Sequence, residues 1–265
     1  MKKLILIGLA LAFVGFEARA EERDAMSILA KAQDAFFYAG PDMKARVTMD
    51  LSAPGGAKRT RVLTMLRKND GRNQKYFMYF HEPGDVRGTA FLVWKYPEKD
   101  DDRWIFVPAV NMVRRIAARD SRSSFVGSDF SYEDVSGRDL SADTHSLLRE
   151  EKLNDADCYV VQSVPKTSAD FTKKISWIDK ATSLPLKEEY YDAQGELARV
   201  FTADRIENLG GDSKTYPTVT RRTMKNVKSG HATEVVFSGV AYGVGLDEGV
   251  FTEQSLQAPP QKWMQ

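Results

Sequence analysis

Cysteine is almost missing from this chain of 265 residues, which contains a single one, Cys158. Because disulfide bonds need pairs of cysteines, a fold held together by them is excluded. Stability must come from packing of the hydrophobic residues, which make up 42% of the chain and can fill a core. Cys158 stands in the strand-like run Cys-Tyr-Val-Val, so we expect a small, buried, apolar residue there.

An excess of charge of one sign is missing as well. The chain has 38 basic and 37 acidic residues, which gives a formal net charge of +1. A nearly neutral surface offers no general attraction to nucleic acid or to an anionic membrane. We therefore expect no nucleic-acid partner.

Long hydrophobic runs are confined to the start of the chain. Lys2 and Lys3 precede an apolar stretch from Leu4 to Phe16, and Ala18-Arg19-Ala20 has the small residues that a signal peptidase recognises. The stretch is too short for a stable membrane span, although a retained anchor is the alternative. We predict a signal peptide over residues 1–20, cleaved after Ala20. Glu21 follows instead of a lipid-attachment cysteine, so the exported protein, with a charge of −1, is expected not to be lipidated.

Sequence patterns of catalysis are also missing. His81-Glu82 is followed by Pro83, which would break the helix of a zinc protease, and no Gly-x-Ser-x-Gly nucleophile motif occurs. We expect His81, His145 and His231 to be structural or exposed. The sequence therefore predicts a binding protein and not an enzyme, with no catalytic residue, metal site or cofactor. A pair of carboxylates such as glycosidases use has no sequence signature, so an exported hydrolase stays the third alternative.

Hydrophobic periodicity predicts one helix followed by many strands. Apolar residues recur at helical spacing over Ala25–Tyr38, and Gly40-Pro41 ends that pattern. Afterwards the period is two. Strands are expected over residues 47–51, 62–66, 76–80, 90–94 and 104–107, and near 147–153, 158–165, 172–179, 185–192, 196–207, 216–227 and 232–242. Their spacing is typical of a barrel or sandwich, and we expect a single domain over residues 21–265.

Two of these strands, Tyr76–Phe80 and Ala90–Trp94, are apolar on both faces, which requires that both faces be covered. One interpretation is a filled sandwich or a helix-covered sheet. The other is a barrel that holds a ligand cavity. The 9 methionines and 14 phenylalanines, together with the amphipathic helix, favour the cavity, because flexible apolar side chains suit irregular apolar ligands.

The stretch Pro108–Gly137 has no regular pattern, and irregular stretches of this length are usually functional loops. Its apolar residues would let it close over an opening as a lid. It also carries Arg114, Arg115 and Arg119. These arginines are either a solvated helical face or a contact to an anionic headgroup or an acidic partner.

Several segments resemble a known family. They are Phe106-Val107-Pro108-Ala109 with Arg114-Arg115-Ile116, then Ser124-Phe125-Val126-Gly127-Ser128-Asp129-Phe130-Ser131-Tyr132-Glu133-Asp134, then Trp177-Ile178-Asp179-Lys180 through Leu184-Pro185-Leu186-Lys187 to Tyr191-Asp192 and Gly195, and finally Gly245-Leu246-Asp247-Glu248 to Phe251. Together they span most of residues 22–255. They are similar to the outer membrane lipoprotein-sorting protein family, the proteins like LolA and LolB. The long stretch Pro108–Gly137 is similar to the branch associated with RND-type exporters.

The resemblance implies a mainly antiparallel α+β fold, an incomplete, half-open β-barrel whose helices cover an apolar cavity. It implies a monomeric periplasmic carrier for a lipid, for lipoprotein acyl chains or for another apolar cargo. An RND-type inner-membrane transporter and an outer-membrane acceptor would be its partners. The alternative is an interaction module that docks on a transporter and carries nothing.

We assign residues to this cavity on the assumption that one alternate set of side chains faces inward. The expected lining is Met49, Met65, Phe77, Tyr79, Phe91, Val93 and Phe106. The expected lid residues are Phe36, Phe37, Met112, Phe125 and Phe130, and Arg114, Arg115 and Arg119 are the expected headgroup or partner contacts. A shift of one residue in register would exchange the two faces of a strand.

Overall fold

The structure, a computed structural model, describes residues 24–167, 169–210 and 214–264. The expected signal peptide and its cleavage site lie outside these residues. In chain order the strands are β1 (Asp42–Ser52), β2 (Lys58–Asp70), β3 (Asn73–Glu82), β4 (Ala90–Lys95), β5 (Asp102–Val107), β6 (Met112–Ile116), β7 (Asp143–Leu153), β8 (Ala156–Pro165), β9 (Lys173–Asp179), β10 (Pro185–Tyr191), β11 (Leu197–Gly210), β12 (Thr215–Asn226) and β13 (Ala232–Tyr242). A helix over residues 24–37 precedes them.

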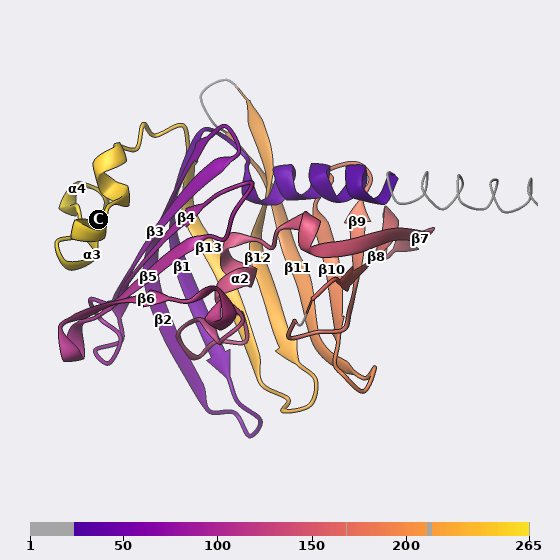
Figure 1. Cartoon of the computed structure of the whole chain (residues 1–265), viewed down its shortest axis with the longest axis horizontal. Coiled ribbons are helices and arrows are strands. Elements are labelled where there is room, and N and C mark those ends of the chain that lie inside the picture. Colours follow the sequence, from indigo (N-terminus) through magenta and orange to yellow (C-terminus); the bar gives the residue numbers. More distant parts are fainter. Residues whose placement is uncertain (1–23, 168, 211–213, 265) are drawn as a thin grey trace, which may run out of the picture.

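These strands form one antiparallel sheet in the order β6-β5-β4-β3-β2-β1-β13-β12-β11-β10-β9-β8-β7. Strands that are consecutive in sequence pair with each other, except β6 and β7, and β1 also pairs with β13 in the middle of the sheet. The two edges are therefore β6 and β7, and in the described part of the chain no pairing joins them. The predicted incomplete antiparallel barrel is confirmed (Figure 1).

Strand β6 corrects the sequence prediction, which treated Pro108–Gly137 as irregular throughout. The strand pairs with β5 from Val107↔Met112 to Arg103↔Ile116. It escaped prediction because Met-Val-Arg-Arg-Ile shows no clear alternation. An edge strand does not need that alternation, and charged side chains on it discourage pairing with other sheets.

The sheet has two apolar faces, which the alternation of side chains separates. Tyr76, Met78 and Phe80 of β3 belong to a large cluster on what we call the inner face, whereas Phe77 belongs to a second cluster on the outer face. Residues at the C-terminus cover the outer face, in η5 (Glu248–Phe251), α3 (Glu253–Gln257) and α4 (Gln261–Met264). Both faces of β3 and β4 are thus covered, as their apolar sequences predicted.

The inner face is crossed by residues 117–142, which we call the crossing segment. Because β6 and β7 are opposite edges, the chain must pass from one edge to the other over this face (Figure 1). The segment contains η2 (Ala118–Asp120), η3 (Phe125–Gly127), α2 (Tyr132–Ser136) and η4 (Leu140–Ala142). Helix α2 begins with a capping box, in which Ser131 and Asp134 each accept a backbone N–H of the other.

The helix over residues 24–37 covers another part of the inner face, and its position confirms the predicted amphipathic pattern. Ala25, Leu29 and Ala32 pack against Val161 of β8 and Ile178 of β9. One turn further on, the helix presents aromatic side chains to the large inner cluster. Helix and crossing segment together cover the inner face (Figure 1).

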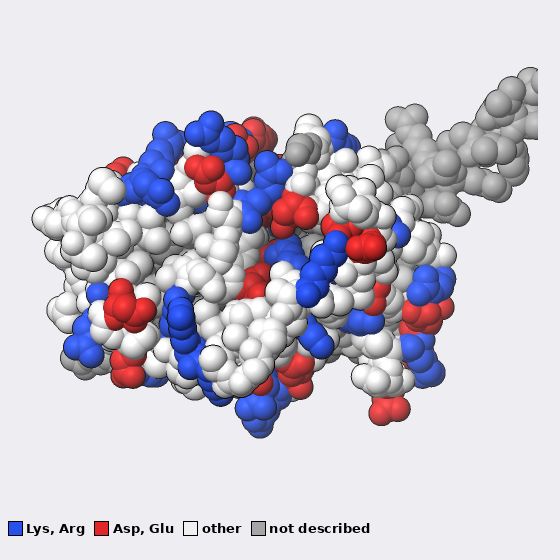
Figure 2. Space-filling view, turned by 90° about the horizontal axis from the view of Figure 1, so that it is seen from below, with Lys and Arg blue, Asp and Glu red and all other residues white. Residues whose placement is uncertain are grey.

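The buried free thiol of Cys158 on β8 agrees with the expectation from the sequence. It packs with Val160 and Trp177 in a small cluster of its own. Burial raises the pKa of the Cys158 thiol, which keeps it protonated and unreactive. Elsewhere on the surface, Figure 2 shows basic and acidic side chains lying side by side over the face seen from below.

Candidate functional site

The seven residues predicted to line a cavity divide between the two faces. Met49, Met65, Phe91 and Val93 lie on the inner face, beneath the helix and the crossing segment. Phe77, Phe106 and Tyr79 lie on the outer face, under the C-terminal helices, and this part of the assignment is wrong. The error is one of register. Alternate residues of a strand point to opposite faces, and the inward residues of these strands include Tyr76, Met78, Phe80 and Ile105.

Four of the five predicted lid residues cover the inner face. Phe125 and Phe130 of the crossing segment are buried in the inner cluster, and Phe36 packs against it from the helix. Phe125 contacts the rings of Phe80, Phe91 and Tyr132, with centroids 5.4–5.9 Å apart. Met112 is the exception, because it lies on edge strand β6 with 50% of its surface exposed. Its assignment to the lid is wrong.

The three predicted contact arginines lie at the β6 edge, away from the apolar interior. Arg114, Arg115 and Arg119 are exposed. Arg115 forms an ion pair with Asp102, and Arg119 lies 3.7 Å from Asp120. Arg119 also borders an open polar pocket of about 450 Å³, whose rim carries charges of both signs. Arg114 and Arg115 are part of a strand, so the alternative of a solvated helical face is corrected to an exposed strand edge.

The apolar interior contains three small adjoining pockets around the end of the helix. Their volumes are about 50, 90 and 80 Å³, and Phe36 and Phe37 line all three. The two rings meet edge to face, 4.8 Å apart, and Phe36 also contacts Phe201 of β11. These aromatic side chains occupy most of the space between helix and sheet.

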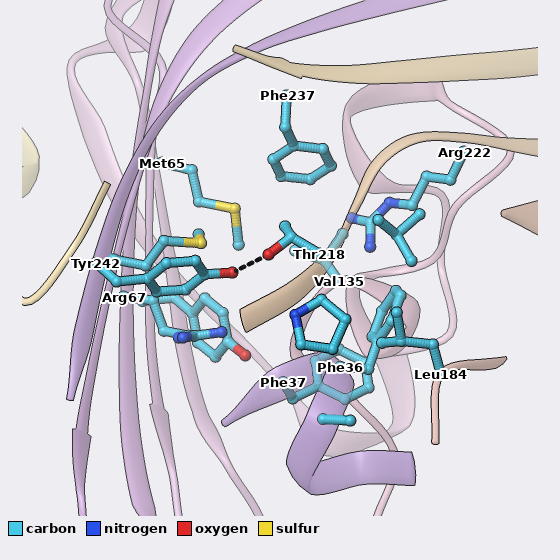
Figure 3. Close-up of a pocket in the computed structure, with 15 residues that line it drawn as sticks. Phe36, Phe37, Met65, Arg67, Val135, Leu184, Thr218, Arg222, Phe237 and Tyr242 are labelled. Carbon is cyan, nitrogen blue, oxygen red and sulfur yellow. Dashed lines mark hydrogen bonds between the residues drawn. The ribbon is translucent and has the colours of Figure 1, made fainter. Parts of the chain in front are cut away.

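We call the first of these the central pocket (Figure 3). It is lined by Ala35, Phe36, Phe37, Met43, Met65, Arg67, Tyr76, Val135, Leu184, Pro217, Thr218, Val219, Arg222, Phe237 and Tyr242. A hydrogen bond of 2.8 Å joins the hydroxyls of Thr218 and Tyr242. Arg67 of β2 and Arg222 of β12 reach the pocket from opposite sides (Figure 3).

Sequence reasoning missed these two arginines. In β12 the pair Arg221-Arg222 is the signal that could have found Arg222, because alternation sends one of two adjacent side chains to the inner face. Arg222 is the inward one and Arg221 is exposed. Arg67 follows Leu63 and Met65 on the inward side of β2, and it is buried although it is charged.

Paired charges line two of the three pockets beside the apolar side chains. Lys174 Nζ donates to Glu188 Oε1 at 2.9 Å, and Glu188 also accepts from Ser176 at 3.0 Å and Tyr190 at 2.7 Å. Burial alone would raise the pKa of Glu188, but Lys174 and these hydrogen bonds outweigh it and hold the pKa below its usual value. Burial alone would lower the pKa of Lys174, but the nearby Glu188 outweighs burial and raises it.

Charged side chains also fix the crossing segment in place. Asp134 accepts from Arg199 of β11 at 2.8 Å, and Arg138 joins Glu133 to Asp143 at the start of β7. Burial raises the pKa of Glu133, although the nearby Arg138 partly counteracts this. The Gly-Ser-Asp-Phe motif of the sequence ends in Phe130, which is buried in the inner cluster, and its Asp129 accepts from Thr233 of β13 at 2.7 Å.

In the described residues no helix has the length and apolar character needed to cross a membrane.

Comparisons with known proteins identify the family. A family model described as an uncharacterized protein matches residues 72–258, more than half of the chain. A comparison with curated proteins gives no match. Among solved structures, a DUF1329 family protein from Desulfovibrio piger is 29% identical, with a TM-score of 0.79 over 91% of this chain and 99% of that one.

Two further structures agree. A domain assigned to the outer membrane lipoprotein-sorting proteins, from Vibrio parahaemolyticus, has the same identity, coverage and TM-score. A LolA superfamily protein from Nitrosomonas europaea is 25% identical, with a TM-score of 0.67 over 87% of this chain and 98% of that one. The resemblance found in the sequence is confirmed. The chain belongs to the DUF1329 family and has the fold of the LolA superfamily and of the outer membrane lipoprotein-sorting proteins.

Proposed function

We propose that this protein is a periplasmic carrier that holds a lipid, the acyl chains of a lipoprotein or another apolar molecule between the inner face and its cover. The cargo would be shielded from water on its way toward the outer membrane. One observation carries the proposal: an apolar sheet face is covered by a helix and a crossing segment instead of by further strands. The similar structures, described as lipoprotein-sorting and LolA superfamily proteins, support it.

The cover can separate from the sheet without breaking the pairing of the strands. Side chains fix the crossing segment, through Asp129 with Thr233 and Asp134 with Arg199. The helix is tied to the sheet in the same way, by Gln74 Nε2 donating to the backbone carbonyl of Phe37 at 2.7 Å. The hydrogen bonds to the two carboxylates contribute about 1.5–3 kcal/mol each, so breaking a few such contacts costs less than unfolding a sheet of thirteen strands.

An incoming chain must displace aromatic side chains, because the pockets of about 50–90 Å³ are smaller than the ~300 Å³ of ordinary ligand sites. Phe36, Phe37 and Phe130 occupy the space now. Burial of each methylene group contributes ~0.8 kcal/mol, so a chain of sixteen carbons offers roughly 12 kcal/mol to offset that displacement. Binding of a long chain would therefore require the aromatic side chains to move.

The proposal includes an RND-type transporter as the donor and an outer-membrane acceptor. The exposed β6 edge is the candidate contact, since Val110 and Met112 are 63% and 50% exposed beside Arg114 and Arg115. Exposed apolar side chains next to arginines are typical of protein–protein interfaces. Reversing both charges, with Arg114→Glu and Arg115→Glu, should weaken partner binding and leave cargo binding intact. Unchanged partner binding would make this edge an ordinary solvated one.

The test of the carrier function is direct. The protein, purified from the periplasm, should release lipid in native mass spectrometry and solvent extraction, and should take up the fluorescent probe N-phenyl-1-naphthylamine. Met65→Trp, which fills the central pocket, should reduce uptake several-fold, whereas Met112→Trp on the exposed edge should not. A protein that carries no lipid and takes up no probe would contradict the proposal.

A docking module that carries nothing is the second candidate. The observation that favours it is the small volume of the pockets, which the protein's own phenylalanines fill. Such a module would bind its transporter as well with Met65→Trp as without it, and would remain free of lipid. A carrier would bind the transporter but deliver no cargo after that substitution.

A further inference from the structure

The central pocket has an unusual combination of charge and apolar surface. Its charged residues are two arginines, Arg67 and Arg222, and no acidic residue is among the described residues that line it. Apolar and aromatic side chains form most of the remaining wall. A cavity meant for a purely apolar ligand gains nothing from buried positive charge, because removing a charge from water is unfavourable.

Arg222 has no acidic partner in the part of the chain that the structure describes. Its Nε is buried without a hydrogen-bond partner. The guanidinium lies over three rings, 5.3 Å from Phe36, 5.5 Å from Phe130 and 4.8 Å from Phe237. Burial lowers the pKa of Arg222 to about 10, so the side chain is still charged at neutral pH. Aromatic faces compensate a cation weakly, which leaves a positive charge poised for an anion.

The carboxylates of the adjoining pocket already serve other cations. Asp134 pairs with Arg199, Glu188 with Lys174, and Glu133 with Arg138. Each of these acids has a basic partner within 3.1 Å, and in the described residues none of them forms an ion pair with Arg222. Asp134 thus acts on Arg222 only from beyond ion-pair distance, where it raises the pKa of the guanidinium without forming a contact.

Arg67 likewise forms no ion pair in the described residues. One of its terminal nitrogens donates to the backbone carbonyl of Ala39, but its Nε is buried without a partner in the described residues. Its guanidinium lies 6.0 Å from the ring of Tyr242. Arg67 is thus partly satisfied, whereas Arg222 is the better placed of the two to bind a group that enters the pocket.

We propose that the cargo is an anionic amphiphile, a single carboxylate or phosphate on an acyl chain, and that Arg222 binds its anionic group in the central pocket. This inference rests on the proposed carrier function and narrows it from any apolar molecule to one class. The fork of a guanidinium suits carboxylate and phosphate alike. The acyl chain would lie along the inner face, in the space beside Phe36 and Phe37.

The experiment measures the affinity of the full mature protein for three probes of equal chain length: hexadecanoate, hexadecyl phosphate and the uncharged hexadecanol. Arg222→Met removes the charge and keeps an unbranched apolar stem, and Arg222→Lys keeps the charge without the fork. The matched control is Arg221→Met. Arg221 is the neighbouring residue on β12, exposed and 3.9 Å from Glu234.

Arg222→Met should weaken binding of at least one anion about tenfold or more, because a hydrogen bond to a charged group is lost. Hexadecanol should bind as before, Arg222→Lys should recover part of the anion affinity, and Arg221→Met should match the wild type. The anion that loses more identifies the headgroup as carboxylate or phosphate. An equal loss for all three probes, or none, would overturn the assignment.

Wild-type binding separates this inference from the carrier function itself. Binding of hexadecanol without either anion would overturn the inference and leave the carrier intact. Failure to bind all three probes would overturn both. Thermal unfolding checks that Arg222→Met is folded, and Arg222→Gln replaces it if it is not, with the same expected loss.

Discussion

His231 Nδ1 donates a hydrogen bond of 2.6 Å to Oδ2 of Asp129, a residue 102 positions earlier in the chain. The hydroxyl of Thr233 donates to the same oxygen at 2.7 Å and accepts the backbone N–H of Asp129 at 3.0 Å. Three hydrogen bonds thus hold the crossing segment to the start of β13. The carboxylate of Asp129 accepts two of them, and its backbone N–H donates the third. This contact is the most concentrated attachment between the cover and the middle of the sheet.

Asp129→Ala should loosen the cover. It removes the acceptor of two of these hydrogen bonds, so the free energy of unfolding should fall by about 1–3 kcal/mol. Hydrogen exchange should accelerate within residues 117–142, and bound probe should leave faster. Asp120→Ala is the control, because Asp120 lies in the same segment and its carboxylate is near the exposed Arg119. Similar exchange rates in both variants would show that Asp129 does not hold the cover.

Glu188→Gln should destabilise the protein strongly. It leaves Lys174 charged and without its carboxylate partner, in a place where the loss of one member of a pair costs about 3–5 kcal/mol. The neighbouring Glu189→Gln breaks the pair with Lys187 nearer the surface and should cost ~1 kcal/mol or less. Urea unfolding at neutral pH measures both. Equal effects would mean that the Lys174–Glu188 pair is no more important than a surface pair.

The contribution of Glu188 should also depend on pH. Its folded pKa lies below the unfolded value of 4.5, so the stabilisation is present above that value and is lost as the pH falls through the folded pKa. The pKa of Lys174 is raised, so its part persists until the pH rises above 10.5. The difference in stability between wild type and Glu188→Gln should therefore stay constant between neutral pH and pH 10.5 and shrink in acid. A difference that is constant from neutral pH to about pH 3 would contradict this.

Arg222→Met and Arg199→Met should have opposite consequences for the empty protein. Arg199 pairs with Asp134 and Asp170, so its loss leaves two carboxylates without their partner and should cost about 3–5 kcal/mol. Arg222 has only aromatic neighbours to lose, worth ~0.5–1 kcal/mol each, while the cost of burying its charge disappears. We expect Arg222→Met to leave stability unchanged or raise it. A loss as large as that of Arg199→Met would point to an acidic partner.

Phe77→Ala and Met78→Ala test the assignment of the two faces. Both side chains are fully buried, so each substitution should cost about 2–5 kcal/mol. Only Met78 faces the cavity, where it borders a pocket with Met65 and Phe130. Its removal should increase uptake of N-phenyl-1-naphthylamine, whereas Phe77→Ala should leave uptake unchanged. Equal uptake by the two variants would argue against a cavity on the inner face.

Local patterns predicted much of this fold correctly. The helix expected over Ala25–Tyr38 covers residues 24–37, and each predicted strand is found with boundaries shifted by a few residues. These features depend on neighbours in the sequence, since apolar spacing and turn residues act over a few positions. The weakly patterned β6 was missed, because it is held by its partner β5 and not by its own alternation.

The candidate site was harder to predict. Alternation groups Phe77 with Tyr79 and Met78 with Phe80, but it does not say which group faces the helix. That depends on which face the C-terminal helices cover, more than 160 residues further along the chain. Arg222 was missed for a similar reason. Its sequence neighbours do not show that the acids around it have been taken by Arg199, Arg138 and Lys174.

The sequence by itself determined the near-neutral charge, the buried character of Cys158, the family resemblance and the alternation that makes a sheet with two apolar faces. The tertiary structure alone decided that β1 pairs with β13, that the chain crosses the inner face between β6 and β7, and that Arg222 is left without an acidic partner in the described residues. Propensities and periodicity act locally, whereas pairing and charge compensation depend on residues that only folding brings together.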